Sequence, residues 1–150
     1  MRLVLDTNIL ARAVCSPGGP AAELFERTCA RHVLIVSSEL LEELARVLSY
    51  DRLRRMHQLS DAEIEAFIEG IESGATVVPL PDPLPRVVPD DPDDDVIVAT
   101  AVAGRGEVLC TLNRHLFHER VVEYCRGHSI SVLNDADLLR TLRESELSQS

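Results

Sequence analysis

Short apolar segments alternate with amphipathic helical segments along almost the whole chain. The strand-like segments are residues 2–6, 32–37, 75–80, 107–113 and 130–133. The spacing of apolar residues predicts helices at 7–15, 20–31, 37–49, 60–71, 91–103, 119–126 and 134–147. Strands that alternate with helices favour a parallel sheet covered by helices on both faces. The predicted fold class is therefore α/β.

Size and composition are typical of one soluble, intracellular domain. The chain has 150 residues, 45% of them apolar, and a chain of this length can bury roughly two-thirds of its unfolded surface. Five prolines between residues 81 and 92 predict an extended linker within the domain. No apolar stretch approaches the roughly 20 residues of a membrane span, and Asp6 interrupts the segment that a signal peptide would need. We expect a cytoplasmic protein with no membrane partner, and buried, reduced thiols at Cys15, Cys29, Cys110 and Cys125.

Acidic charge is concentrated in one stretch of the sequence. The formal net charge is −10, and residues 82–95 hold six acids and one arginine, which together account for −5 of it. A net-acidic chain is a poor non-specific binder of DNA. It can still act on nucleic acid where metal ions supply the missing positive charge.

The segment PDDPDDDVIVATAVAG, residues 89–104, places five aspartates directly before an apolar helix. Capping and the helix dipole explain two of them, with Asp91 at the N-cap and Asp94 in the first turn. Repulsion among the five indicates that something positive offsets their charge. Asp95 shares a helix face with Val98, and a carboxylate on an apolar face is costly unless it is paired or binds a metal. Asp95 is therefore the candidate ligand of this run.

Four more candidates lie at strand ends or on a helix face. Asp6 ends the first strand, although capping of the next helix would explain it equally well. Thr111 and Asn113 fall at the end of the fourth strand, and ligands of parallel sheets bind beyond the carboxyl ends of the strands. Glu43 lies on one helical stripe with Val47. These positions predict one polar site at the carboxyl edge of the sheet.

Other charged residues near Glu43 have simpler interpretations. Glu42 is placed to pair with Arg46 at a spacing of four on the helix surface. The arginines that follow favour a solvated basic turn, with contacts to phosphate or to a partner as the alternative. They are Arg46, Arg52, Arg54 and Arg55.

The candidate acids suit divalent cations. Asp6, Glu43 and Asp95 offer the hard oxygen ligands that hold Mg²⁺ or Mn²⁺. Such ions polarise a phosphodiester and lower the pKa of a bound water. Thr111 and Asn113 offer groups that orient water or backbone. The histidines of HLFH lack an obvious third ligand for zinc, and the glycines of SPGGP match no nucleotide-binding fingerprint. The sequence therefore predicts metal-dependent hydrolysis.

The chain resembles the PIN-domain ribonucleases, specifically the VapC-like group that act as toxins in bacterial toxin–antitoxin pairs. Four motifs carry the resemblance in the expected order: LVLDTNILARAVCSPGGPAAEL, IVSSELLEELARVLS, DPDDDVIVATAVAG, and VLCTLN followed by HLF. The closing strand and helix, ISVLNDADLL, extend it over residues 1–143, which leaves 144–150 as a flexible tail. The resemblance implies a three-layer α/β/α sandwich with a central, mainly parallel sheet, a Mg²⁺ or Mn²⁺ cofactor, and cleavage of single-stranded RNA.

Residue by residue, the resemblance implies that Asp6, Glu43 and Asp95 are the metal-site acids and that Thr111 is the hydroxyl residue of the fourth motif. Asn113 is a departure, because aspartate is frequent there, and it favours one tightly held ion over two. The resemblance also implies a homodimer and a small antitoxin partner. The sequence leaves open the roles of Asn8, Glu42, Asp91, Asp93 and Asp94.

Three rival classes are compatible with parts of the pattern. A DNA structure-specific nuclease would need a larger basic surface than this acidic chain offers. A phosphohydrolase or receiver-like domain would need a second acid beside Asp6 and a lysine, and the chain has no lysine. A catalytically weak PIN module that acts by partner binding would explain Asn113, but the three retained carboxylates count against it.

Overall fold

The computed structural model describes residues 1–89 and 91–149, and its centre is a five-stranded parallel sheet. The strand order is β3-β2-β1-β4-β5. The strands are β1 (Arg2–Leu5), β2 (Val33–Val36), β3 (Thr76–Val77), β4 (Val108–Cys110) and β5 (Ser131–Leu133). All five lie within the segments that the apolar pattern predicts.

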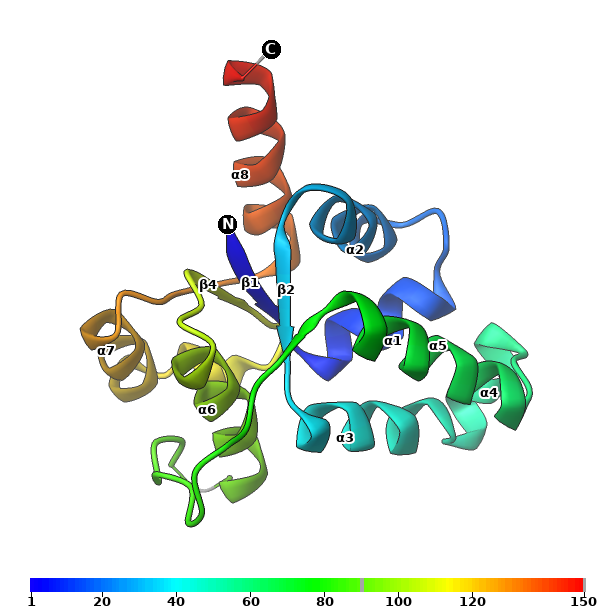
Figure 1. Cartoon of the computed structure of the whole chain (residues 1–150), viewed down its shortest axis with the longest axis horizontal. Coiled ribbons are helices and arrows are strands. Elements are labelled where there is room, and N and C mark those ends of the chain that lie inside the picture. Colours follow the sequence, from blue (N-terminus) through cyan, green and yellow to red (C-terminus); the bar gives the residue numbers. More distant parts are fainter. Residues whose placement is uncertain (90, 150) are drawn as a thin grey trace.

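Helices cover both faces of this sheet, which confirms the predicted three-layer α/β/α fold. Figure 1 shows α6 and α7 on one side of the strands and α1, α2 and α5 on the other. The helices are α1 (Thr7–Cys15), α2 (Pro20–Arg31), α3 (Ser38–Leu48), α4 (Asp51–His57), α5 (Asp61–Gly74), α6 (Asp95–Ala103), α7 (Glu119–Gly127) and α8 (Asp135–Ser148). Two short 3₁₀ helices are η1 (Pro92–Asp94) and η2 (Arg114–Phe117).

Three elements differ from the sequence-based expectation. The predicted basic turn after α3 is the helix α4. The predicted helix 91–103 is divided into η1 and α6, which begins only at Asp95. The short helix η2 falls in a segment for which no element was predicted. By contrast, α8 agrees with the helix predicted at residues 134–147, and it runs past the predicted domain limit at residue 143. The flexibility of residues 144–150 stays a prediction, and Ser150 lies outside the described residues.

The core forms because parallel strands are covered on both faces and must be apolar on both. Leu3, Val4 and Leu5 of β1 are fully buried, as are Ile35 and Val36 of β2. All four cysteines are free, and burial follows the prediction only in part. Cys110 and Cys125 are buried, whereas Cys15 is half-buried and Cys29 is exposed. Within the described residues, no helix combines the length and the apolar character that crossing a membrane would require.

Gly104 marks the end of α6 at a place where the helix touches β2. A Cβ at this position would collide with Cγ2 of Ile35 and would lie 3.1 Å from its Cδ1. Since Ile35 is fully buried, it has little room to move away. We expect Gly104→Ala to lower the free energy of unfolding by about 2 kcal/mol in urea titrations, the usual cost of overpacking a core.

Gly70→Ala is the matched control for this prediction. Gly70 lies within α5, and a Cβ there would meet nothing within 4 Å. Because alanine is the better helix former, this change should be neutral or slightly stabilising. Equal stabilities of the two variants would contradict the close approach of Gly104 to β2.

Candidate metal site

Asp6 follows β1 directly and lies at the carboxyl edge of the sheet. Its backbone N–H donates to the carbonyl oxygen of Cys110 in β4, at 2.9 Å. Its Oδ1 caps α1 by accepting from the N–H of Thr7 at 2.7 Å, and its Oδ2 accepts from the Thr111 hydroxyl at 2.7 Å. Burial raises the pKa of Asp6, and the hydrogen bonds from Thr111 and Thr7 lower it in part. Asp6 therefore caps the helix and also presents a buried carboxylate to the site.

Glu43 lies half-buried on α3, facing the same region. Burial raises its pKa, the negative charge of Asp6 raises it further, and Arg46 offsets part of that effect. Asp94 also raises the pKa of Glu43, so the three acids interact. The predicted surface pair of Glu42 and Arg46 is not among the ion pairs of the described residues, and Arg46 acts on Glu43 instead.

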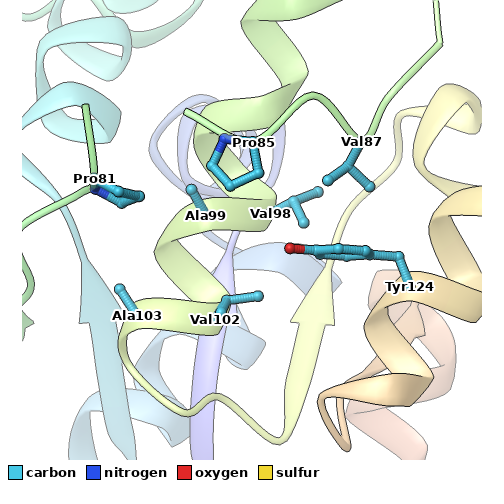
Figure 2. A pocket seen from close by; sticks show the side chains of 8 residues that line it. All are labelled: Pro81, Pro85, Val87, Val98, Ala99, Val102, Ala103 and Tyr124. Carbon is cyan, nitrogen blue, oxygen red and sulfur yellow. The ribbon is translucent and has the colours of Figure 1, made fainter. Parts of the chain in front are cut away.

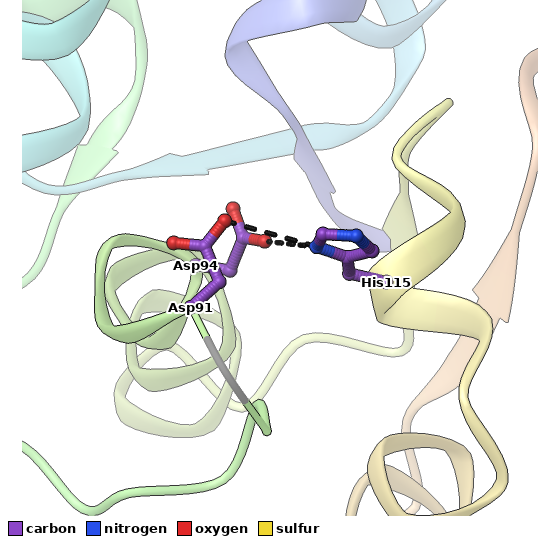
Figure 3. Close-up of side chains that lie close together, drawn as sticks. All are labelled: Asp91, Asp94 and His115. Atoms are coloured by element: carbon purple, nitrogen blue, oxygen red, sulfur yellow. Dashed lines mark ion pairs between the residues drawn. The ribbon is translucent and has the colours of Figure 1, made fainter.

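Asp94 is the third acid that the fold brings to this region. Burial raises its pKa to about 6; the hydrogen bond from Asn113 lowers it, and the charges of Asp91 and Asp6 raise it. His115 completes a tight group, because its Nδ1 lies 3.8 Å from Oδ2 of Asp91 and 3.8 Å from Oδ2 of Asp94. Figure 3 shows the two carboxylates together on one side of a gap and the imidazole on the other. The ligand atoms of these three residues lie within 4.8 Å of one another.

Asp95, the predicted third acid, is engaged elsewhere. Its side chain is almost completely buried, and its Oδ1 accepts from the N–H groups of Val87 and Val88, both at 2.8 Å. Its Oδ2 lies 3.1 Å from Nε of Arg86. These three donors belong to the proline-rich segment, which packs over α6 so that Val87 lies close to Val98 (Figure 2). Asp95 thus anchors this segment to α6, and its neighbour Asp94 points into the acidic site.

Thr111 and Asn113 link Asp6 to Asp94 through hydrogen bonds. The Asn113 side-chain amide donates to Oδ2 of Asp94 at 2.8 Å, and its backbone N–H donates to the Thr111 hydroxyl oxygen at 2.9 Å. Thr111 in turn donates to Asp6. Both residues therefore lie where the strand-end rule predicts, and both hold a carboxylate in place.

The donor set fits a hard divalent cation. Asp6, Glu43 and Asp94 offer carboxylate oxygens, and burial raises the pKa of each of them. Mg²⁺ usually binds proteins through one or two carboxylates and keeps several of its waters, so the acids need not touch one another. Asp91 and His115 extend the set on the outer side.

The acid cluster predicts that the metal-free protein loses stability as pH rises. The pKa of Asp94 is about 6 in the folded protein and near 3.8 in the unfolded chain. Its stabilising contribution is therefore complete below about pH 4 and is lost as pH rises through about 6. We expect urea titrations in EDTA to show this loss between about pH 4 and 6, and Mn²⁺ to restore stability at pH 7.

Asp94→Asn is the control for that measurement, because every other titrating group is present in both proteins. The variant lacks the part of the pH-dependent loss that Asp94 contributes, whereas Asp6 and Glu43 keep theirs, so the difference in unfolding free energy between wild type and variant should change with pH. A difference that is constant over the whole of that pH range would contradict the raised pKa of Asp94.

Sequence reasoning did not include His115 in this candidate site, and it left the roles of Asp91 and Asp94 open. A usable signal was present, since Asp94 precedes the apolar helix by one residue and His115 follows the fourth strand closely. Because these residues lie far apart in the sequence, no local pattern indicates that they are close in the fold. The adjacency of α6 and β4 brings together residues that lie about twenty positions apart.

Comparisons with known proteins agree with this fold. A family model described as PIN domain matches residues 2–115. The fold is similar to that of a chain in the crystal structure of VapBC2 from Rickettsia felis bound to a DNA fragment from their promoter, with a TM-score of 0.60 and 16% sequence identity. The similarity covers 89% of this chain and 98% of that chain. No curated protein sequence matches the chain. Because the family model spans most of its length, the chain belongs to the PIN domain family.

Proposed function

We propose that this protein is a metal-dependent endoribonuclease that hydrolyses phosphodiester bonds in single-stranded RNA, and that it is the toxin of a toxin–antitoxin pair. The observation that carries the proposal is the chain of hydrogen bonds that joins Asp6 to Asp94 through Thr111 and Asn113 at the carboxyl edge of the sheet. Burial and the charges of Asp6 and Asp94 raise the pKa of Glu43, which supports its place beside them. Membership of the PIN domain family supports a nuclease.

In this proposal, some residues of the chain would bind the metal ion and others would position those ligands. Asp6, Glu43 and Asp94 would hold Mg²⁺ or Mn²⁺, which polarises the phosphodiester and activates a bound water. Thr111 keeps Asp6 in position, and Asn113 does the same for Asp94.

The partner proposal rests on fold similarity. The Rickettsia felis structure contains VapBC2 on promoter DNA. By analogy we propose a small antitoxin that binds and inhibits this chain, and a homodimer as its assembly. With a net charge of −10, the chain itself is unsuited to bind DNA without such a partner.

The test is cleavage of mixed-sequence single-stranded RNA by purified protein in EDTA, Mg²⁺ and Mn²⁺, with Asp6→Asn prepared in parallel. We expect cleavage in either metal, none in EDTA, and none by Asp6→Asn. Calorimetry with Mn²⁺ would accompany the assay. Absence of both cleavage and metal binding would overturn the proposal and favour a PIN module that acts only by partner binding.

A further inference from the structure

A pocket with a cavity volume of about 760 Å³ lies between α1, the start of α2, the end of α3 and α4. Its lining mixes apolar and basic side chains. Those that carry the argument are Arg12, Cys15, Val47, Tyr50, Arg52 and Leu112. None of them belongs to the acidic site, so this pocket is a separate feature of the surface.

Residues that line the pocket are close neighbours, along the chain, of residues in the acidic site. Asn8 and Leu112 line its border, and the N–H of Leu112 donates to Oδ1 of Asn8 at 3.4 Å. Asn8 follows Asp6 by two residues, and Leu112 follows Thr111 directly. On α3, Val47 lies one turn beyond Glu43, which is a distance of about 6 Å along the helix axis. A ligand that reaches the carboxylates can therefore extend into the pocket.

Two arginines line the pocket, and no ion pair among the described residues neutralises their positive charge. Arg12 and Arg52 are both exposed, and neither side chain has an ion-pair partner among the described residues. They approach from opposite walls, since Arg12 lies on α1 and Arg52 on α4. Burial raises the pKa of Cys15 on α1, and the charge of Arg52 offsets part of that rise, which places Arg52 across the pocket from it. Two unpaired guanidinium groups in one concavity suit an anionic ligand.

An aromatic side chain lies beside these charges. Tyr50 is 51% exposed, which is unusual for a large aromatic residue in a chain with so few of them. Single-stranded nucleic acids bind to such surfaces by stacking a base on the ring while basic side chains contact the backbone. A peptide partner would use the apolar lining but would leave both arginines without an anion unless it were acidic.

We propose that this pocket binds the nucleotide next to the scissile phosphate of single-stranded RNA. Tyr50 stacks the base, and Arg12 and Arg52 hold the phosphate. The inference rests on the proposed ribonuclease function and adds a substrate subsite to it.

Fluorescence anisotropy tests the subsite. The probe is a labelled, mixed-sequence, single-stranded RNA of about ten nucleotides, titrated with Asp94→Asn protein, which leaves the probe intact. Adding Arg12→Gln and Arg52→Gln together should weaken binding at least tenfold. It should also reduce the slope of log Kd against log salt concentration by about 0.7 for each phosphate that the variant no longer neutralises. Tyr50→Ala should weaken binding about tenfold, whereas Tyr50→Phe keeps the ring and should bind normally.

Arg126→Gln is the matched control, because Arg126 is an exposed arginine on α7, outside the pocket. In cleavage assays without Asp94→Asn, the pocket variants should raise KM while kcat changes little. Variants that bind RNA with the affinity and salt slope of their parent would overturn the subsite, leave the nuclease proposal standing, and assign the pocket to a protein partner. Wild-type protein that neither binds nor cleaves RNA would overturn the nuclease proposal itself.

Discussion

Replacing Asp94 with asparagine should abolish metal-dependent RNA cleavage, with a rate loss of roughly 100-fold or more. The carboxylate of Asp94 accepts from Asn113, which is linked through Thr111 to Asp6, and asparagine in its place removes one of the three negative charges that would hold the ion. A metal ion supplies several kcal/mol of transition-state stabilisation, and each 1.4 kcal/mol is about tenfold in rate. Asp95→Asn should retain most of the activity, because Asp95 faces away toward Val87 and Val88.

The two variants form a matched pair, since they make the same chemical change at neighbouring positions. Single-turnover cleavage in Mn²⁺ measures the rates, and thermal melting in EDTA shows whether each variant is folded. Asp94→Asn should melt at or above the wild-type temperature at pH 7, because it relieves repulsion within the site. An inactive Asp95→Asn beside an active Asp94→Asn would restore Asp95 as the metal ligand and would refute our assignment.

The fold was predictable because its signal is local. Each strand of a parallel sheet is buried on both faces and appears in the sequence as a short apolar run, and each covering helix shows its own period. The helix α4 lacked such a signal. Its seven residues contain three arginines and only one buried side chain, Leu53, so no apolar stripe identifies it.

The site was predictable where position alone determines it. Asp6 and Thr111 follow buried strands, so the topology of a parallel sheet places them at one edge. The third acid of the site could not be identified from position alone. Helical periodicity identified Asp95 as the residue that turns inward, and it is buried, but periodicity does not reveal what lies opposite. The answer depends on the path of the proline-rich segment, which no local pattern determines.

Asp95→Ala should destabilise the protein by about 2–6 kcal/mol. The N–H groups of Val87 and Val88 are buried with their residues, and both donate to the same oxygen of Asp95. Removing that oxygen leaves two buried donors without an acceptor, at a cost of about 1–3 kcal/mol each. In a chain of this size, each kcal/mol lowers the melting temperature by roughly 2–4 °C. Urea unfolding at pH 7 measures the loss directly.

Asp95→Asn removes the negative charge of Asp95 but keeps an oxygen that can accept the two backbone hydrogen bonds. Asparagine keeps an oxygen for the two N–H groups and gives up only the pairing with Arg86, whose side chain is 66% exposed. Ion pairs with so exposed a partner contribute about 0–1 kcal/mol, so this variant should lose about 1 kcal/mol. If Asp95→Asn were as unstable as Asp95→Ala, the charge and not the acceptor would hold the segment. If Asp95→Ala is the less stable of the two variants, as we expect, Asp95 is buried in order to accept the two backbone hydrogen bonds. Asp94 is then the acid of this run that is available to a metal.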